Sequence, residues 1–326
     1  MRRDPALDGL RGLAILGVVG YHAGWLAGGW AGVNLFFALS GFLITSLLLA
    51  EWDRTGALDL PRFWRHRVAR LLPASVVALA GLVALTWLLH PREVGTVGVG
   101  ALVVLLYVAN IVLLWHPVAQ TKWAWSLSLE EQFYALWPLV LRSALQRGVS
   151  RRSLARGAVV VACVAVVARS LVAGAHPDAG YATVRGDELL LGCALALAPV
   201  RVSRAGGAVA AAVLALLWWR ADPGAAAVTV AGLASVSLVG AVVSGFGGPV
   251  LRWGPLRFVG RISYALYLWS CGLGAVLLGY PGDGVLVVWL TSSVLLAYVS
   301  TRFVEEPVRA WAAGRRPLER SVGGGS

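Results

Sequence analysis

Two ionisable residues, Arg11 and His22, stand inside the first long apolar run of the sequence, Leu10–Ala27. If this run is helical, their separation makes three turns, so the two side chains share one stripe about 16 Å apart along the axis. Ionisable side chains at lipid depth are costly and usually functional. A histidine can act as a general base near neutral pH, whereas an arginine keeps its charge. The spacing fits such chemistry and a purely structural pair equally well.

A second group of candidates lies in the basic segment 62–70, whose sequence is RFWRHRVAR. Arg67 and Arg70 are three residues apart and would be neighbours on one helical face, with Arg65 close by. Guanidinium groups bind phosphate bidentately and stay charged, so this segment could hold a polyanion. The ordinary alternative is a basic anchor on the cytoplasmic side of a membrane.

The most unusual stretch is 123–138, WAWSLSLEEQFYALWP, in which Glu130 and Glu131 precede an apolar helix. Ser126 or Ser128 could cap the start of this helix, where acidic residues are also favoured. Capping explains one carboxylate better than it explains two carboxylates together with Tyr134. Other polar residues in or beside later apolar runs are Arg169, Arg185, Ser263 and Tyr267.

The composition of the chain indicates which kind of element carries these residues. Of its 326 residues, 58% are hydrophobic and 13% are charged, and the mean hydropathy is +0.75, which is typical of a membrane protein. Because roughly 17–25 apolar residues cross a bilayer as a helix, the sequence predicts an all-α, polytopic membrane helix bundle with about ten transmembrane helices. The apolar runs are Leu10–Ala27, Val33–Ala50, Leu72–Leu89, Val97–Leu114, Gly157–Gly174, Leu189–Val200, Gly206–Trp219, Ala225–Val243, Ile262–Leu278 and Val285–Val299.

The positive charge of the chain falls in alternate loops. Of 28 Lys and Arg residues, 23 lie in loops that share one side if the chain crosses at each run. Positive loops remain cytoplasmic, so both termini are predicted to be cytoplasmic in a multi-pass protein of the inner (plasma) membrane. The formal net charge of +12 then reflects topology, and we expect a lipid bilayer and no nucleic acid as partner. The loops are 1–11, 51–72, 142–156, 200–206, 252–261 and 302–320.

The segment 92–135 disturbs this alternation. Both 97–114 and 127–141 look able to span, yet two crossings there would place the arginine-rich loop 142–156 outside. We therefore expect a part of 92–135 to be re-entrant or interfacial. Non-helical backbone at membrane depth is tolerated only where it is buried in protein or lines a wet cavity, so this segment is expected to border a site.

The domain organisation is expected to be simple. Residues 1–310 should form one membrane domain, and residues 311–326 a short basic cytoplasmic tail. The three cysteines, Cys163, Cys193 and Cys271, lie in separate apolar runs without the spacing of metal ligands or of a disulfide framework. Neither a bound metal nor a bound cofactor is expected.

The order of these motifs resembles the acyltransferase-3 family of multi-spanning membrane acyltransferases nearly end to end. The segment LDGLRGLA from Leu7, followed by His22, is similar to the opening helix of the family, and WSLSLEEQFY from Trp125 is similar to its most specific signature. Ser270 stands where many members have histidine, and Asn34 stands where aspartate is frequent. The further blocks, in the expected order, are GVNLFFALSGFLI from Gly32, RHRVARLLP from Arg65, residues 185–192, SYALYLW from Ser263 and EPVR from Glu306.

The resemblance implies a reaction and roles for the candidates. An acyl group, most simply acetyl, would pass from cytoplasmic acyl-CoA as co-substrate to a hydroxyl of a carbohydrate or glycosylated metabolite. His22 would be the general base, and Arg11 would hold the donor. Glu130 and Glu131, expected at the outer face, would orient His22 or bind acceptor hydroxyls.

The resemblance also implies two binding regions. The phosphates of acyl-CoA would be bound by Arg65, Arg67 and Arg70. The positions expected to line the acceptor site or its cavity are Ser126, Tyr134, Arg185, Ser263 and Tyr267.

The alternative is a transporter or flippase of a small polar or lipid-linked substrate, because buried charges in a multi-span bundle also mark substrate pathways. No internal inverted repeat is evident, and the ordered motifs favour the enzyme. Consumption of labelled acyl-CoA by the purified protein would distinguish the two. The motifs specify neither the acceptor nor the length of the acyl chain.

Overall fold

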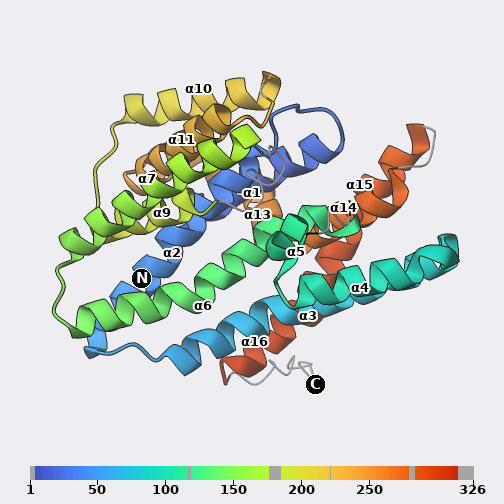
Figure 1. Cartoon of the computed structure of the whole chain (residues 1–326), viewed down its shortest axis with the longest axis horizontal. Coiled ribbons are helices and arrows are strands. Elements are labelled where there is room, and N and C mark those ends of the chain that lie inside the picture. Colours follow the sequence, from blue (N-terminus) through green and yellow to red (C-terminus); the bar gives the residue numbers. More distant parts are fainter. Residues whose placement is uncertain (1–3, 116–118, 176–184, 221, 279–282, 315–326) are drawn as a thin grey trace, which may run out of the picture.

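A computed structural model gives the architecture, and it describes residues 4–115, 119–175, 185–220, 222–278 and 283–314. In these ranges all regular structure is helical, without a strand, as predicted (Figure 1). The helices are α1 (Pro5–His22), α2 (Ala31–Thr55), α3 (Leu60–Leu89), α4 (Val94–Leu105), α5 (Ala109–Trp115), α6 (Trp125–Gln146), α7 (Arg151–Ala175), α9 (Asp187–Leu197), α10 (Arg204–Arg220), α11 (Ala225–Val243), α12 (Gly248–Leu251), α13 (Gly254–Arg261), α14 (Ser263–Leu277), α15 (Asp283–Ser300) and α16 (Glu306–Ala312). Short 3-10 turns, η1 (Pro91–Glu93) and η2 (Ala119–Ala124), and a π turn, η3 (Thr301–Glu305), join some of them.

The membrane character is carried by several of these helices. Five helical stretches are long and apolar enough to cross a bilayer. Three are the helices α2, α3 and α11, and the fourth is Arg151–Val172 of α7. The fifth is the continuous stretch Gly284–Ala312, which joins α15, η3 and α16. Two further apolar helices, Arg204–Trp219 and Ser263–Leu277, are shorter. The chain is thus a multi-pass helix bundle. The expected number of about ten crossings is not confirmed, because several apolar runs form helices shorter than the roughly 17–25 residues of a full span.

Two boundaries differ from the sequence-based expectation. The first apolar run is helical only as far as His22, since the chain turns at Gly24, where φ is 75°. The basic segment 62–70, expected as part of a loop, instead forms the first turns of α3. Asp59 caps this helix by accepting a hydrogen bond from the backbone N–H of Arg62 at 3.0 Å, and Pro61 suits its first turn.

Helices α2 and α9 pack closely because each presents a glycine to the other. A Cβ atom at Gly41 would lie 1.9 Å from the carbonyl oxygen of Leu189, and one at Gly192 would lie 2.3 Å from that of Ala38. Small residues at helix interfaces allow the backbones to approach, which is a common device in membrane bundles. This contact fixes the start of α9 against the middle of α2.

The segment expected to be irregular is indeed broken. Helix α4 folds back along α3 (Figure 1), and the chain then turns at Tyr107, where φ is 55°. Side chains of α6 satisfy the exposed backbone at this turn. Gln132 donates to the carbonyl of Tyr107 at 2.8 Å, and Ser128 accepts from the N–H of Ala109 at 3.1 Å. Such compensation makes irregular backbone tolerable inside a bundle.

Residues 91–146, from the end of α3 to the end of α6, lead the chain from one end of the bundle back to the other once, in spite of the break. Helix α6 starts in its middle and ends where Arg151 forms an ion pair with Asp53, near the end of α2. Leu145 of α6 also belongs to the hydrophobic cluster around Leu60 at the start of α3. We call this the basic end of the bundle, and we call the opposite end, where α1 and α3 finish, the far end. The sides of the membrane on which these ends lie remain a prediction.

Candidate active site

A buried charged cluster occupies the middle of the bundle, with Arg67 at its centre. The Arg67 guanidinium lies 3.7 Å from a carboxylate oxygen of Glu130 and 3.6 Å from one of Glu131. It also stacks over the ring of Tyr134, with 3.4 Å between its central carbon and the ring centroid. The exposed side-chain fractions are only 15% for Arg67, 20% for Glu130 and 12% for Glu131, so these charges depend on one another for compensation.

Glu130 is held by hydroxyl groups in addition to Arg67. The side chains of Ser40, on α2, and Tyr134, one turn along α6, both donate hydrogen bonds to the same carboxylate oxygen. Three helices thereby converge on one carboxylate. Ser40 was not among the candidates from sequence, because a serine in an apolar helix carries no distinctive signal.

Two more arginines complete the charged cluster. A nitrogen of Arg11 lies 3.4 Å from the hydroxyl of Ser263, and its guanidinium is 5.6 Å from the ring centroid of Phe36. Arg11 interacts electrostatically with Glu130 and Arg67, and Arg70 interacts with both arginines. Arg11 also interacts with Asp8, and Arg70 with Glu305, so carboxylates offset the charge of the three arginines.

The expected separation of Glu130 and Glu131 from Arg67, into opposite halves of the membrane, is wrong. The physical reason is the broken segment before α6. It delays the start of that helix to the middle of the bundle, so the signature carboxylates lie at the depth of the first turns of α3.

His22 is oriented by a backbone carbonyl and not by a carboxylate. Its Nδ1 lies 2.8 Å from the carbonyl oxygen of Val18, one turn back on α1. Because a carbonyl only accepts, Nδ1 carries the hydrogen, and a neutral ring then keeps the lone pair on Nε2. That nitrogen faces the sulfur of Cys271 on α14, at 3.9 Å. Along α1, His22 stands about 16 Å from Arg11, so these two cannot act on the same atom.

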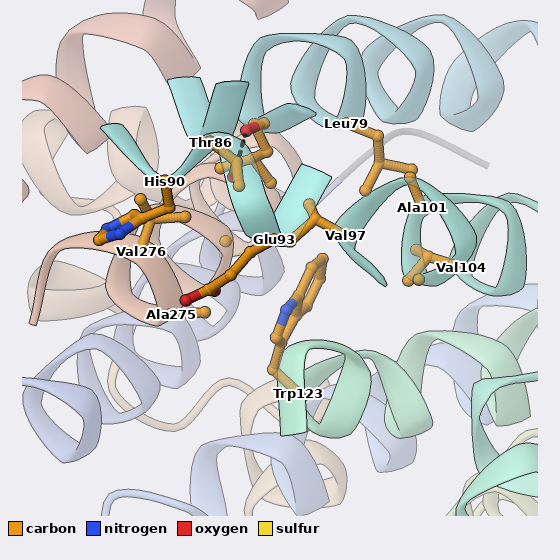
Figure 2. A pocket seen from close by; sticks show the side chains of 13 residues that line it. Leu79, Thr86, His90, Glu93, Val97, Ala101, Val104, Trp123, Ala275 and Val276 are labelled. Atoms are coloured by element: carbon orange, nitrogen blue, oxygen red, sulfur yellow. Dashed lines mark hydrogen bonds between the residues drawn. The ribbon is translucent and has the colours of Figure 1, made fainter. Parts of the chain in front are cut away.

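A cavity of about 290 Å³ lies toward the far end, between α3, α4, η2 and α14. Its walls are mainly apolar, and Trp123, Glu93 and His90 supply larger or polar side chains (Figure 2). Ala275, which lines the cavity, is one helical turn from Cys271 and therefore on the same face of α14. The cavity and the imidazole thus adjoin the same helix face.

Tyr267 and Ser126 shape the cavity without lining it. The Tyr267 hydroxyl donates to the backbone carbonyl of Trp123 and lies 2.9 Å from the Ser126 hydroxyl. The rings of Trp123 and Tyr267 meet edge to face, with centroids 6.0 Å apart. Both residues therefore hold Trp123 in place, as befits positions expected at a cavity.

At the basic end, an open groove of about 600 Å³ lies between the start of α3 and α16. Arg62, Arg65 and His66 line one side of this groove, and Trp311 lines the other. Trp311 is 76% exposed, which leaves its indole face accessible. Arg65 is thus the member of the expected phosphate-binding set that faces solvent, whereas Arg67 points inward to the carboxylates.

Arg185 lies in a different polar network, with Glu188 at 2.9 Å. Its guanidinium stacks near Trp125, 5.3 Å from the ring centroid, and the Asn34 amide donates to Glu188 at 2.6 Å. This network ties α9 to α2 and α6. Arg185 therefore does not line the far-end cavity.

Arg169, which stands alone in its apolar run, forms a buried ion pair across helices. Its nitrogen donates to Asp187 at 3.1 Å, and also to the Thr229 hydroxyl at 2.9 Å. The only sequence signal for this pair is that each residue is costly at lipid depth without a partner. Within the described ranges, no three His, Cys, Asp or Glu side chains are grouped as a metal site.

Comparisons with known proteins identify relatives of this chain. YrhL of Bacillus subtilis (strain 168) is 33% identical, over 98% of this chain and 57% of the relative. The peptidoglycan O-acetyltransferase OatA of Listeria monocytogenes is 29% identical, over 94% of this chain and 56% of the relative. The O-acetyltransferase OatA of Staphylococcus aureus (strain NCTC 8325 / PS 47) is 30% identical, over 94% and 57%.

The chain therefore spans little more than half the length of these curated relatives. No solved structure matches it. An acyltransferase domain family matches residues 4–304, which include the charged cluster, His22 and the far-end cavity. This match covers nearly the whole membrane bundle, and the chain belongs to the acyltransferase-3 family of membrane acyltransferases.

Proposed function

We propose that this chain is a membrane O-acyltransferase that moves an acyl group, most simply acetyl, from cytoplasmic acyl-CoA to a hydroxyl of an envelope carbohydrate or glycosylated metabolite. The observation that carries the proposal is the geometry of His22. Its Nδ1 is fixed on the Val18 carbonyl, and its Nε2 faces the same side of α14 as the far-end cavity. Two relatives named as O-acetyltransferases support the same reaction class, one of them acting on peptidoglycan.

In this mechanism the acceptor hydroxyl enters through the far-end cavity. The apolar face of a sugar ring would rest on Trp123, and its hydroxyls would donate to the Glu93 carboxylate. His22 Nε2 takes the proton of the reacting hydroxyl as its oxygen attacks the thioester carbonyl. The carbon–sulfur bond then breaks, and the thiolate of CoA leaves with that proton.

The donor would enter from the basic end. The groove between α3 and α16 offers Arg62 and Arg65 for phosphates and the open face of Trp311 for the adenine ring. The charged cluster, with Arg11, Arg67 and Arg70, lies between this groove and His22, on the route that the donor would take. Arg67, already engaged by two carboxylates, would act by holding the cluster together.

The donor assignment is tested with two thioesters, acetyl-CoA and acetyl-pantetheine, which lacks the nucleotide. In the variant Arg65→Gln, the apparent KM should rise about tenfold for acetyl-CoA and stay unchanged for acetyl-pantetheine, because a lost phosphate contact of about 1.4 kcal/mol affects only the former. Release of free CoA thiol provides the assay. Arg152→Gln, an exposed arginine at the same end, is the control and should behave as wild type.

The proposed base is tested with His22→Ala. Transfer should fall about 10²–10⁴-fold, the usual contribution of a general base, while the protein still inserts and melts normally. A variant that keeps more than about a tenth of the wild-type rate would exclude His22 from proton transfer. A purified wild-type protein that releases no CoA from either thioester would instead favour the transporter.

A further inference from the structure

We propose that Cys271 is a nucleophile that carries the acyl group between donor and acceptor, with His22 as its base. This inference rests on the proposed function and adds a covalent intermediate to it. It starts from the contact between the Cys271 sulfur and Nε2 of His22, at 3.9 Å.

The three cysteines of the chain have different surroundings. Cys163 is exposed on α7. Cys193 is buried, and its thiol donates to the backbone carbonyl of Gly41 at 3.5 Å, which is a structural contact between α9 and α2. Cys271 alone of the three faces the nitrogen of an imidazole. A buried cysteine of the ordinary packing kind needs no such partner.

The surroundings of His22 complete a catalytic arrangement. An activated nucleophile is recognised by a base within reach and by a third group that orients this base. Here the nucleophile is the Cys271 thiol, the base is His22 Nε2, and the orienting group is the Val18 carbonyl, which binds Nδ1 at 2.8 Å. In structures without substrate such contacts are often looser than in the reacting complex, which accommodates the sulfur–nitrogen distance.

The position of Cys271 suits an intermediate between two substrates. The residue is 2% exposed, so a thioester formed there is shielded from water. Ala275, one turn further along α14, lines the far-end cavity from which the acceptor would come. Toward the basic end, Arg11 lies about 16 Å along α1 from His22, the partner of Cys271. An extended pantetheine arm can cover this distance.

The chemistry balances in two steps without a further reactant. First, His22 takes the thiol proton as the Cys271 sulfur attacks the carbonyl of the acyl-CoA thioester. The bond to the CoA sulfur breaks, and free CoA leaves with the proton. Second, His22 takes the proton of the acceptor hydroxyl as its oxygen attacks the Cys271 thioester. The ester forms, and the proton returns to the cysteine sulfur.

The test is to trap the intermediate in the absence of acceptor. Purified wild-type protein is incubated with acetyl-CoA labelled in the acetyl group, and then denatured. One labelled acetyl group per chain is expected, released by neutral hydroxylamine as a thioester is, and located by mass spectrometry in a peptide of α14. Cys271→Ala should lose the label, and its transfer rate should fall about 100-fold or more.

The other cysteines provide matched controls. The double variant Cys163→Ser/Cys193→Ala should keep the label and the transfer rate, because neither thiol faces a base. Melting temperatures of all variants, measured in the same detergent, establish that they are folded. Because the decisive label is sought on the wild-type protein, the result does not depend on any variant being stable.

The outcomes separate this inference from the proposed function. Transfer by wild type without a hydroxylamine-sensitive label, together with an active Cys271→Ala, would overturn the intermediate and leave direct attack by the acceptor. Label on Cys163 or Cys193 in place of Cys271 would overturn it as well. If wild type consumes no acyl-CoA at all, both the intermediate and the proposed reaction are excluded.

Discussion

Arg67 compensates two carboxylates at once, and its replacement leaves both Glu130 and Glu131 as buried charges. Arg67→Met should therefore destabilise the protein by about 3 kcal/mol, the lower end for removing one partner of a buried pair, since some solvent reaches the cluster. The measurement is thermal unfolding in detergent. Arg65→Met, exposed on the same helix, is the control and should change stability by less than about 0.5 kcal/mol.

The carboxylates provide a second arm for this prediction. Adding Glu130→Gln and Glu131→Gln to Arg67→Met removes the uncompensated charges, so part of the stability should return. If the triple variant is less stable than Arg67→Met alone, Glu130 and Glu131 are needed mainly to compensate Arg11 and Arg70, and Arg67 is not their main partner.

Asn34 illustrates how a departure from the family pattern depends on its neighbours. Its amide donates to Glu188 at 2.6 Å and to the carbonyl of Val228 at 3.1 Å. Asn34→Asp, although aspartate is frequent in the family, should lower the melting temperature here, since a second carboxylate would then face Glu188, with Arg185 as the cation beside them. Adding Glu188→Gln should restore stability, and a double-mutant cycle measures the coupling.

The close packing of α2 on α9 is a property of the two helices together. Gly192→Val should prevent this approach, because its Cβ would fall 2.3 Å from the carbonyl oxygen of Ala38 and backbone cannot give way cheaply. Overpacking typically costs about 1–3 kcal/mol, and we expect at least that much in thermal unfolding. Gly157→Ala on α7, where nothing lies within 4 Å, is the control and should be neutral or slightly stabilising. Equal melting of both variants would show that the helices separate freely.

At the scale of the whole molecule, the two cavities proposed for donor and acceptor lie at opposite ends of the bundle. The groove with Arg65 and Trp311 lies at the basic end, whereas the cavity with Trp123 and Glu93 opens toward the far end. If positive loops are cytoplasmic, the donor and the acceptor reach the charged cluster and His22 from opposite sides of the membrane. The chain must then cross the membrane once between Thr55 and the loop after α3, and α3 makes this crossing.

This arrangement predicts the result of labelling with an impermeant thiol reagent in a background without native cysteines. A cysteine at Arg92, which follows α3 at the far end, should react in intact cells. A cysteine at Arg152, at the start of α7, should react only after the membrane is opened. Reaction of both from the same side would contradict a single net traverse by residues 91–146 and the two-sided site.

The amino-acid sequence was enough to predict the class of the protein, and it supplied candidate site residues. Apolar runs and costly charges are local properties, so they predicted a helical membrane bundle and singled out Arg11, His22, Arg67 and Glu130. The irregular segment was also predictable, because charge alternation between loops allows only one net traverse there. Helix lengths were less predictable, since an apolar run does not reveal a turn such as the one at Gly24.

Which of these residues meet depends on how the helices pack in three dimensions. Glu130 was expected at the outer face, to orient His22 or to bind acceptor hydroxyls. The structure pairs it with Arg67 instead, since the break before α6 shifts that helix by a distance that no local pattern records. The orientation of His22 depends on a backbone carbonyl, which has no sequence signature. The contact between His22 and Cys271 joins residues 249 positions apart, and it arises because α1 and α14 pack side by side. Spacing along one helix fixes neighbours on that helix alone, while contacts between helices follow from how their surfaces fit.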